Sequence, residues 1–491
     1  MRLCSETLAS LPDHVQRPTY DRSHVVPAIV HLGIGAFHRA HQAMFTDAVL
    51  ATGDLNWGLI GAGIVSGEMR EALMPQDGLY TLAERSADGE QLRVIGSIID
   101  VLGGPEDAER LLQRMNAVTT RIVTITVTEK GYYLDPATRH LQIEAPAIAA
   151  DLATPQAPHT ILGLIVESLR QRKVGGTPPF TVLSCDNLPN NGKLARAAVL
   201  AFAREVDADL AEWIESFVSF PCTMVDRITP ATTDADRAYV AGQIGMEDAW
   251  PVVTEAFVQW VIEDDFTMGR PDWDKAGAIF SHEIERWENM KLRCLNGAHS
   301  TLAYLGQLTG RETVAEAMQL PLITGILDPL WLEIREVLQA PHGVDSGAYV
   351  DSLKQRFRNP ALKHRTAQIA SDGSQKLPQR VLAPLRDRLA AGLPVPMLAT
   401  AVAAWMHFAT RTAHTPGGVL ADPLSDEILA AARLADDADA IVANLLGLRK
   451  IFGDDLPAHA SFRETLRQQF VALARNPAVA TAVQIRLPVP A

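Results

Sequence analysis

Residues 28–42 read AIVHLGIGAFHRAHQ and contain the transition that decides the fold. The first six are apolar and β-prone, and a helix-like stretch follows them directly. Gly33 and Gly35 lie at the turn, where glycine lets a backbone approach a phosphate closely. The third glycine of the usual dinucleotide fingerprint is missing, because His38 occupies its place. Strand, turn and helix in this order indicate a dinucleotide site, although a two-glycine turn by itself is more often only a turn.

Strands and helices alternate along the following sequence. Apolar, β-prone runs occupy residues 57–64, 121–128 and 180–186, with helical segments between them. Residues 79–101 form two β-prone halves that meet at an Asp-Gly pair, which predicts a hairpin. This alternation predicts a mostly parallel α/β sheet.

The pattern becomes helical from residue 284 onward, and residues 282–308 read as a single long helix. The 491 residues also exceed the roughly 250 to 300 at which one hydrophobic core stops growing. We therefore expect an α/β chain of two domains: a Rossmann-type NAD-binding domain at residues 1–283, followed by a predominantly α-helical substrate-binding and catalytic domain at residues 284–491.

Charge, hydropathy and cysteine content exclude several classes of protein. The chain has 58 acidic and 44 basic residues without a dense run of Lys or Arg, so nucleic acid is not an expected partner. No apolar run approaches the roughly 20 residues that span a bilayer, and the N-terminus lacks a secretory signal pattern. We expect a cytoplasmic protein without membrane association. The four cysteines stand far apart, which predicts reduced thiols and no metal site.

A carboxylate after the second strand would accept hydrogen bonds from the ribose hydroxyls of NAD, and Glu68 is the candidate. Its distance from the glycine turn is longer than the typical spacing. Arg70 lies close by and could favour the 2′-phosphate of NADP instead. The competing interpretation of Glu68 is a solvated carboxylate at the start of a helix.

Lys291, Asn296 and His299 fall within an arc of roughly 140° on one face of the predicted long helix. This combination suits alcohol oxidation, because a buried lysine can take the hydroxyl proton while a neutral amide steadies the developing oxyanion. The alternative is a surface lysine beside a hydrogen-bonded core histidine, and spacing alone favours that alternative.

Two further polar groups follow predicted strands. Asp186, Asn187 and Asn191 come after the strand at 180–186, at the sheet edge where open α/β folds hold ligands. Asn187 could bridge cofactor and substrate, although Asn, Pro and Gly also supply ordinary turn chemistry. The neighbouring Asp226 and Arg227 are compatible with a structural ion pair.

Taken together, these stretches resemble the long-chain mannitol dehydrogenase family of polyol and hexuronate oxidoreductases. The resemblance covers nearly the whole chain, is highly specific, and implies a Rossmann-type domain, a helical domain and no catalytic metal. The stretches that carry it are IVHLGIGAFHRAHQ, TVTEKGYY, TVLSCDNLPNNG, FPCTMVDRITP, FVQWVIEDDF and MKLRCLNGAHS.

The resemblance assigns roles by position. Lys291 becomes the general base, Asn187 and Asn296 the oxyanion stabilisers, and His299 a partner that orients the substrate. It implies NAD rather than NADP, a monomer, and a small-molecule sugar acid or polyol as substrate. Substrate contacts would be Asp226 and Lys376, and the pyrophosphate site would comprise Ile29, Val30, His31, Leu32, Gly33, Ile34, Gly35, Ala36, Phe37, His38, Arg39 and Ala40.

Two branches of the family compete. Residues 359–380, NPALKHRTAQIASDGSQKLPQR, resemble the fructuronate reductase branch, which interconverts D-fructuronate and D-mannonate. In the mannitol branch an arginine usually stands eight residues before the lysine corresponding to Lys376, and here Gln368 occupies that place. Arg365 lies three residues before Gln368, one helical turn away, so we expect it to bind the substrate carboxylate.

Two other functions stay open on the sequence. One is a mannitol 2-dehydrogenase or related polyol dehydrogenase that acts on fructose, mannitol or arabinitol. The other is a sensor that binds NAD and a sugar acid without turnover. Retention of Lys291 argues against the sensor, because binding alone does not require a base.

Overall fold

The computed structural model describes residues 1–135, 138–480, 482 and 487, and it divides into two compact units. Unit 1 comprises Met1–Glu285, and unit 2 comprises Arg286–Ala491. The last part of the predicted helical domain, residues 481, 483–486 and 488–491, lies outside the described residues.

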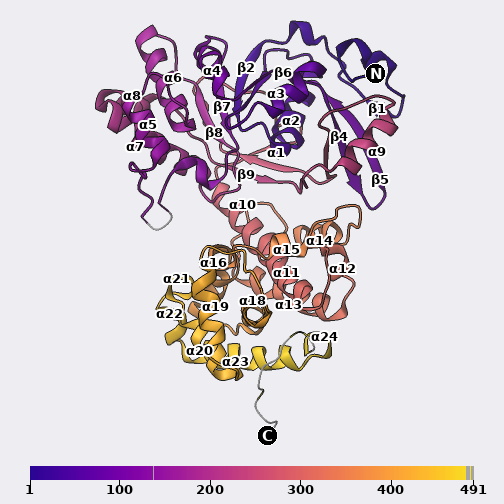
Figure 1. Ribbon diagram of the computed structural model, residues 1–491, viewed down its shortest axis with the longest axis vertical. Helices are drawn as coiled ribbons and strands as arrows, with labels where there is room; N and C mark the ends of the chain where they lie inside the picture. The colour runs from indigo at the N-terminus through magenta and orange to yellow at the C-terminus, as the bar shows by residue number, and fades with distance from the viewer. Residues whose placement is uncertain (136–137, 481, 483–486, 488–491) are drawn as a thin grey trace. The chain divides into compact units, whose positions relative to one another are not determined.

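A five-stranded parallel sheet forms the centre of unit 1, in the order β6-β3-β2-β7-β8 (Figure 1). The chain runs outward from β2 to β3 and β6, then returns to β7 on the other side of β2, so the strand order reverses there. This doubly wound arrangement confirms the predicted Rossmann-type fold. The strands are β2 (Pro27–Leu32), β3 (Gly58–Gly63), β6 (Ile98–Gly103), β7 (Ile122–Ile125) and β8 (Thr181–Ser184).

Alternate residues of each strand supply two different cores. Val30 packs in a cluster with Val123 and Ile165, whereas its neighbour Ile29 packs on the other face with Phe45. Because both faces are covered, the strands are apolar throughout rather than alternating. The helices of unit 1 are α1 (Ala36–Ala40), α2 (Gln42–Leu50), α3 (Glu68–Leu73), α4 (Ala108–Asn116), α5 (Pro146–Ala153), α6 (Ile161–Gly175), α7 (Asn191–Val206), α8 (Ala208–Phe217) and α9 (Asp234–Ile244).

The first helix is broken, contrary to the single helix expected after the glycine turn. His41 separates α1 from α2 with φ −122° and ψ −94°, outside the helical region. At this break the guanidinium of Arg227 donates to the carbonyl oxygen of Ala40, and the His41 ring contacts the carbonyl oxygen of Gln259 at 3.1 Å. Contacts with residues distant in sequence therefore replace, at this break, the helical contacts that the local sequence predicts.

Two smaller sheets complete unit 1. The predicted hairpin is confirmed, because β4 and β5 pair antiparallel across the Asp-Gly turn, but it belongs to a separate four-stranded sheet. The expectation of one mostly parallel sheet is therefore incomplete. The four-stranded sheet contains β1 (Val15–Gln16), β5 (Gly89–Ile95), β4 (Tyr80–Ser86) and β10 (Val252–Glu255), and the three-stranded sheet contains β12 (Ile279–Phe280), β11 (Gln259–Ile262) and β9 (Thr223–Asp226).

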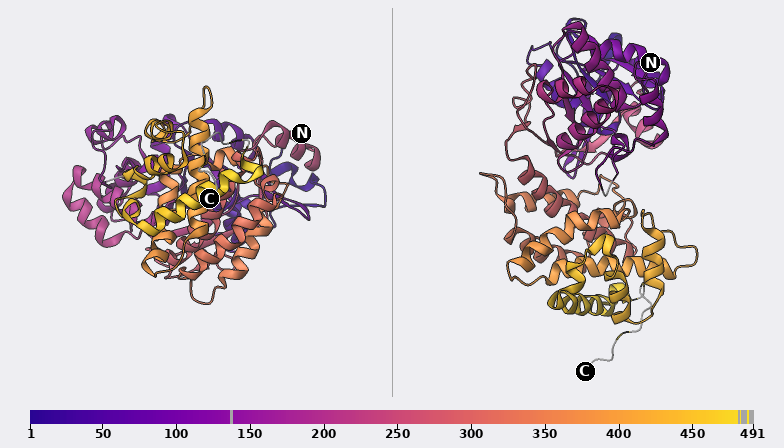
Figure 2. Two further views of the ribbon diagram at one scale, coloured as in Figure 1. Left: turned by 90° about the horizontal axis from the view of Figure 1, so that it is seen from below. Right: turned by 90° about the vertical axis from the view of Figure 1, so that its left-hand side faces the viewer.

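In the described part of unit 2 the regular elements are all helices (Figures 1 and 2). The long, alanine-rich α18 packs against α11, α13, α19 and α23, and its small side chains allow these neighbours to approach closely. The helices are α10 (Ile284–Met290), α11 (Ala298–Leu308), α12 (Val314–Ala317), α13 (Pro321–Glu336), α14 (Ser346–Phe357), α15 (Thr366–Ile369), α16 (Gly373–Leu377), α17 (Ala383–Ala390), α18 (Pro396–His414), α19 (Ser425–Arg433), α20 (Ala438–Leu446), α21 (Arg449–Phe452), α22 (Asp455–Ala458), α23 (Ala460–Arg475) and α24 (Pro477–Ala480).

The long helix predicted at residues 282–308 is confirmed as a continuous helical run from Ile284 to Leu308, but it is not a uniform α-helix. A π-helical segment, η6 (Lys291–Gly297), interrupts it between α10 and α11. A second π-helical segment, η7 (Pro378–Leu382), lies between α16 and α17 and packs against η6. Such segments are rare and occur frequently at functional sites.

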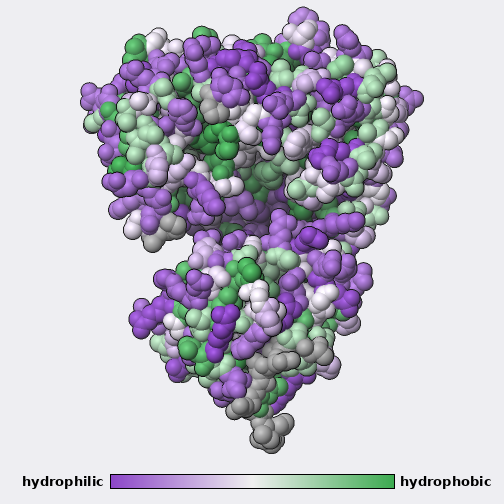
Figure 3. Space-filling model, in the orientation of Figure 1, coloured by the Kyte–Doolittle hydropathy of each residue, from purple (hydrophilic) through white to green (hydrophobic). Residues whose placement is uncertain are grey.

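Surface and thiol properties agree with the composition. In Figure 3 polar side chains dominate the visible face of each unit, with apolar ones interspersed. Within the described residues, no helix is both long and apolar enough to cross a bilayer. Cys185, Cys222 and Cys294 are buried, Cys4 is partly exposed, and all four are free thiols.

Buried histidines predict acid sensitivity. Burial lowers the pKa of His31 to about 3 and that of His407 to about 4, whereas both titrate near about 6.5 when unfolded. Between pH 6.5 and 4 the unfolded chain therefore binds protons that the folded chain does not. Each such histidine should lower the free energy of unfolding by about 1.4 kcal/mol per pH unit as the pH falls through this window. Thermal unfolding at pH 7, 6 and 5 measures the slope.

His407→Gln should make this pH dependence shallower, because the buried titrating ring is gone. His140 is exposed, so His140→Gln is the matched control and should leave the slope unchanged. An identical slope for His407→Gln and the wild type would contradict the assignment.

Candidate functional site

The glycine turn of unit 1 forms a cradle at the carboxyl end of β2. Gly33 has φ 102°, and a Cβ there would lie 2.1 Å from the carbonyl oxygen of Thr126 in the loop after β7. Only glycine fits this contact. Gly35 is exposed and its N–H donates to the carbonyl oxygen of Gly33 at 2.7 Å, while a Cβ on Gly35 would meet nothing closer than 3.8 Å. The turn is thus closely packed at Gly33 and open at Gly35. Close approach of a pyrophosphate requires this combination.

The stretch Ile29–Ala40, predicted as the cofactor site, divides into buried and accessible parts. The four strand residues Ile29–Leu32 are at most 1% exposed, and their side chains belong to the interior. Accessible surface remains at Gly33, Gly35, Ala36 and Phe37. A cofactor would therefore meet mainly the backbone of the turn and the first residues of α1.

His38 and Arg39 from the same stretch are interior side chains. The His38 ring stacks on the His31 ring at a centroid distance of 3.4 Å, which explains why this position is not the third glycine of the fingerprint. Arg39 donates to the carbonyl oxygen of Trp250 and lies over the Tyr80 ring at 5.1 Å. Both residues hold α1 against the rest of the unit.

Glu68 and Arg70 lie on α3, which follows β3, the neighbour of β2. Glu68 is exposed at the first helical position. The Nε atom of Arg70 lies 3.3 Å from Oδ2 of Asp107, so an acid of unit 1 already engages this guanidinium. Glu68 can accept hydrogen bonds from ribose hydroxyls, whereas Arg70 is already paired with an acid. This arrangement favours the ribose hydroxyls of NAD over the 2′-phosphate of NADP.

Asp186 organises the strand ends, a role that the sequence did not reveal. Its Oδ1 accepts from the N–H groups of Val127 at 2.9 Å and Thr128 at 2.8 Å, and its Oδ2 accepts from the hydroxyl of Tyr132 at 2.7 Å. Burial raises the pKa of Asp186, and these hydrogen bonds oppose that rise. The loop after β7 is thus fixed to the end of β8, and Thr128 is held there at φ 64°.

The other residues of this polar group differ in role. Asn187 is exposed at the end of β8. Asn191 is fully buried, and its Nδ2 donates to the carbonyl oxygens of Asp186 and Thr223, each at 2.9 Å. Asn191 is therefore structural, whereas Asn187 keeps an accessible amide.

Asp226 and Arg227 are both buried at the end of β9. Arg227 pairs with Glu84 and also donates to the carbonyl oxygens of Ala40 and Glu255. A structural ion pair is therefore present, with Glu84 as its acid.

The π-helical segment η6 brings together the predicted catalytic residues of unit 2. Lys291 and Asn296 are five residues apart, and the i to i+5 hydrogen bonding of a π-helix places such residues one turn apart on the same side. His299 follows in the first turn of α11. Lys291 and Asn296 are 6% exposed and His299 is 7% exposed, so the group is nearly buried.

Two atoms of this group are buried without a protein partner. Within the described residues, neither Nδ2 of Asn296 nor Nε2 of His299 forms a hydrogen bond. Buried polar atoms are normally satisfied, because an orphaned donor or acceptor costs about 1 to 3 kcal/mol. These two atoms are available to a polar ligand, although orphaned atoms also occur in unit 1, at His38 and Arg39.

Aromatic contacts rather than hydrogen bonds position the His299 ring. It stacks on Phe357 at 5.1 Å and meets the edge of His364 at 4.8 Å. Burial, and then the nearby His364, lower the pKa of His299 well below its ordinary value, so the ring is neutral near pH 7. Neither Phe357 nor His364 had been singled out from the sequence.

Cationic side chains surround this ring. Arg380, Arg356 and Lys376 all lie close enough to lower the pKa of His299 further. Lys376 donates to the hydroxyl of Ser371 at 3.2 Å and lies 3.6 Å from Oδ2 of Asp372. Three cations therefore lie near His299, and the Asp372 carboxylate beside Lys376 offsets part of their charge.

Arg365 and Gln368 occupy a different environment from the one expected. Arg365 is the N-cap of α15 in an extended conformation, at φ −79° and ψ 128°, so the prediction that it lies one helical turn from Gln368 is wrong. Its backbone pairs with Thr313 in an isolated bridge. Both Arg365 and Gln368 are exposed.

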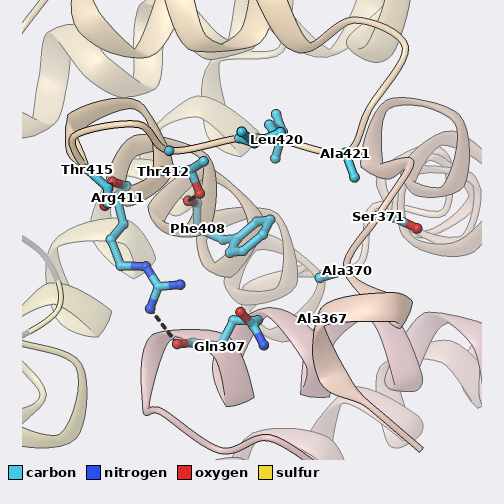
Figure 4. Close-up of a pocket in the computed structure, with 12 residues that line it drawn as sticks. Gln307, Ala367, Ala370, Ser371, Phe408, Arg411, Thr412, Thr415, Leu420 and Ala421 are labelled. Atoms are coloured by element: carbon cyan, nitrogen blue, oxygen red, sulfur yellow. Dashed lines mark hydrogen bonds between the residues drawn. The ribbon is translucent and has the colours of Figure 1, made fainter.

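A pocket of 320 Å³ opens elsewhere in unit 2, between α11, α15 and α18. Figure 4 shows the Arg411 side chain reaching across it to donate to the carbonyl oxygen of Gln307. Of the predicted residues, none lines this pocket. Its lining residues are Gln307, Ala367, Ala370, Ser371, Phe408, Arg411, Thr412, Thr415, Gly418, Val419, Leu420 and Ala421.

Comparison with protein families gives two matches that together span most of the chain. The Mannitol dehydrogenase Rossmann domain matches residues 27–275, and the Mannitol dehydrogenase C-terminal domain matches residues 283–474.

Individual proteins show the same similarity over nearly full length. The D-mannonate oxidoreductase of Escherichia coli is 46% identical over 455 residues, covering 91% of this chain and 93% of the relative. The mannitol 2-dehydrogenase of Pyrenophora tritici-repentis is 40% identical, covering 98% and 85%. A solved structure of Pseudomonas fluorescens mannitol 2-dehydrogenase, a ternary complex with NAD and D-mannitol, is 38% identical with a TM-score of 0.85 and covers 98% of both chains.

The packing of η6 against η7 predicts an intolerant glycine. A Cβ at Gly297 would lie 2.7 Å from the carbonyl oxygen of Arg380. Gly297→Ala should therefore lower the free energy of unfolding by about 1 to 3 kcal/mol through overpacking. Thermal unfolding measures the change.

Gly325→Ala in α13 is the matched control, because nothing lies within 4 Å of a Cβ at that position. It should be neutral or raise stability by up to about 1 kcal/mol, as alanine does in an exposed helix. If both variants unfold at the wild-type temperature, close packing at Gly297 is not a constraint.

Proposed function

The chain belongs to the mannitol dehydrogenase family, and we propose that it is a member that interconverts D-fructuronate and D-mannonate with NAD. Membership makes it an oxidoreductase of CH–OH groups. The observation that carries the choice of an acid substrate is the concentration of Arg356, Lys376 and Arg380 around His299. The identity of 46% with a D-mannonate oxidoreductase, against 40% with a mannitol 2-dehydrogenase, supports the same choice.

The residues of unit 2 perform the proton chemistry in this proposal. A bound NAD would supply the hydride acceptor for the carbinol carbon, and NADH the hydride donor in the reverse direction. Lys291 takes the hydroxyl proton as that hydride leaves and gives it back in the reverse direction. Asn296, whose Nδ2 is buried without a protein partner, donates to the developing oxyanion, and Asn187 has the same proposed role. His299 orients the substrate hydroxyls.

The residues of unit 1 fit NAD. A Cβ would fill the space at Gly33, and Gly35 leaves its outer side open, so the turn within Ile29–Ala40 accepts a pyrophosphate. Glu68 accepts from the ribose hydroxyls. Asp226, Arg365, Gln368 and Lys376 remain proposed substrate contacts.

A second candidate is a polyol dehydrogenase that acts on mannitol and fructose, since mannitol 2-dehydrogenases are also close relatives. A substrate panel distinguishes the two: fructuronate, tagaturonate and fructose with NADH, and mannitol and arabinitol with NAD. The proposed function requires the highest kcat/KM on fructuronate. A higher value on fructose would move the chain to the mannitol branch, and absence of turnover throughout would favour a sensor.

Removal of the base should abolish most turnover. Lys291→Ala should lower kcat by at least roughly a hundredfold, in line with losses of general-base catalysis, while NADH still binds. Steady-state kinetics and NADH fluorescence titration measure the two effects separately. Lys363, an exposed lysine of the same unit, is the control, and Lys363→Ala should behave as wild type. Near-normal turnover of Lys291→Ala would remove Lys291 from the mechanism.

Replacement of Glu68 should change cofactor preference. Glu68→Ser removes the carboxylate and should narrow the ratio of kcat/KM for NAD over NADP by about tenfold, the scale of one lost charge-assisted hydrogen bond. Glu71 lies on the same short helix and is also exposed, so Glu71→Ser controls for general loss of negative charge. An equal change in both variants would mean that Glu68 makes no specific contact with ribose.

A further inference from the structure

Arg380 is a half-buried arginine with one hydrogen-bond partner among the described residues. It lies in η7, and its Nη1 donates to the hydroxyl of Ser300 at 3.0 Å. Within the described part of the chain, no carboxylate lies within 4.0 Å of its guanidinium. Partial burial lowers the pKa of Arg380 to about 10, and the nearby Tyr304 and Asp372 oppose that fall. Buried charges are normally paired, because removing an ion from water is costly.

Buried arginines of the chain differ in their number of partners: Arg39 keeps two nitrogens without a partner among the described residues, whereas Arg172 is well supplied. Arg172 donates to the carbonyl oxygens of Met115, Ala117, Thr120 and Pro178. That single guanidinium therefore meets four acceptors of the protein.

Two more buried arginines also have several partners within the protein. Arg388 pairs with Glu336 and donates to the carbonyl oxygens of Glu333 and Pro394, and Arg227 pairs with Glu84 as described above. By comparison, Arg380 has one hydroxyl partner among the described residues, and because its side chain is partly exposed, its remaining N–H donors are open to water or to a ligand.

Arg380 lies beside the proposed catalytic group. Its carbonyl oxygen abuts Gly297, the last residue of η6, and its guanidinium contacts Ser300, which directly follows His299. It also contributes to lowering the pKa of His299. Lys376 stands four residues before Arg380, and the two positive charges act on each other. The Arg380 guanidinium therefore lies near the His299 side chain.

We propose that Arg380 binds the carboxylate of the substrate and determines the preference for a sugar acid over a neutral polyol. A planar guanidinium meets a carboxylate with two parallel hydrogen bonds, which the hydroxymethyl end of a neutral sugar cannot reciprocate. Lys376 adds a second positive charge. Arg365, which is exposed, can contribute less, since water screens an exposed ion pair. This inference rests on the proposed function.

The test compares acid and neutral substrates in the full-length enzyme. Arg380→Gln should lower kcat/KM for fructuronate by about 30- to 1000-fold, the scale of breaking a desolvated charge pair, and change kcat/KM for fructose by less than about threefold. Calorimetric titration of the NADH-loaded enzyme with D-mannonate, which cannot react with NADH, should show the same loss in affinity. Titration with D-mannitol should not.

Matched controls separate the carboxylate contact from general effects of charge. Arg411→Gln also removes a guanidinium that donates to α11, at the carbonyl oxygen of Gln307. Arg411 lies in the pocket of Figure 4, so this variant should leave kcat/KM for both substrates unchanged. Arg365→Ala should lower fructuronate turnover by no more than about fivefold. Arg380→Lys keeps the positive charge but lacks the planar guanidinium, so its kcat/KM for fructuronate should lie between those of the wild type and Arg380→Gln. If Arg380→Gln fails to fold, Arg380→Lys tests the carboxylate contact instead.

The outcomes distinguish this inference from the proposed function. Equal losses on fructuronate and fructose in the Arg380 variants would assign Arg380 to structure and overturn the inference, while leaving the proposed function intact. Undiminished fructuronate turnover in Arg380→Lys would overturn the two-pronged contact. A wild-type enzyme that prefers fructose would overturn the proposed function itself.

Discussion

The close approach of Gly297 to the carbonyl oxygen of Arg380 is the contact on which the chemistry of unit 2 depends. It joins two π-helical segments that are distant in sequence, and each segment carries residues of one functional group. The winding of η6 aligns Lys291 with Asn296, whereas η7 brings Arg380 alongside the start of α11. An α-helix through the same residues would rotate Asn296 away from Lys291, because five residues exceed one α-helical turn by about 140°. In the proposed function, the π-helical winding lets one element present both the base and an oxyanion donor.

In unit 1 a glycine likewise allows a close contact with a backbone carbonyl group, here at the turn between a strand and a helix. Gly33 fills the narrow space beside the carbonyl oxygen of Thr126, and Asp186 ties the loop after β7 to the end of β8. Three consecutive strand ends are therefore fixed at the point where the strand order reverses. A rigid edge of this kind keeps backbone N–H groups in place for a phosphate without a basic side chain, which agrees with a chain whose net charge is −14.

Local sequence patterns sufficed for features that depend on neighbouring residues. The apolar run that ends at Gly33 predicted β2 and its turn, and the Asp-Gly pair predicted the hairpin of β4 and β5. Sequence patterns gave wrong predictions where contacts with residues distant in sequence determine the backbone conformation. The break at His41 accompanies contacts with Gln259 and Arg227, which lie about 200 residues away in the chain.

The same limit applied to the candidate site. Lys291, Asn296 and His299 could be identified, because their residue types and spacing suit alcohol oxidation and because they match a family motif. Arg365 was chosen because the expected helix would have placed it beside Gln368, but Arg365 precedes α15 and is exposed. Arg380, which the sequence analysis did not consider, is half-buried, and the degree of burial of a charged side chain is a property of the tertiary fold that spacing alone does not contain.

Electrostatics connects these observations to substrate choice. The chain as a whole is acidic, yet Arg356, Lys376 and Arg380 gather around a neutral His299. Desolvating Arg380 without a carboxylate of the protein costs stability in the free enzyme, and an anionic ligand would offset that cost on binding. In the proposed function a neutral polyol would offer no such compensation, so the site would favour an acid even where the hydroxyls of a polyol could satisfy Asn296 and His299. Preference for a sugar acid would then follow from the positive charge of Arg380, and it would not require a pocket of different shape from that of a polyol dehydrogenase.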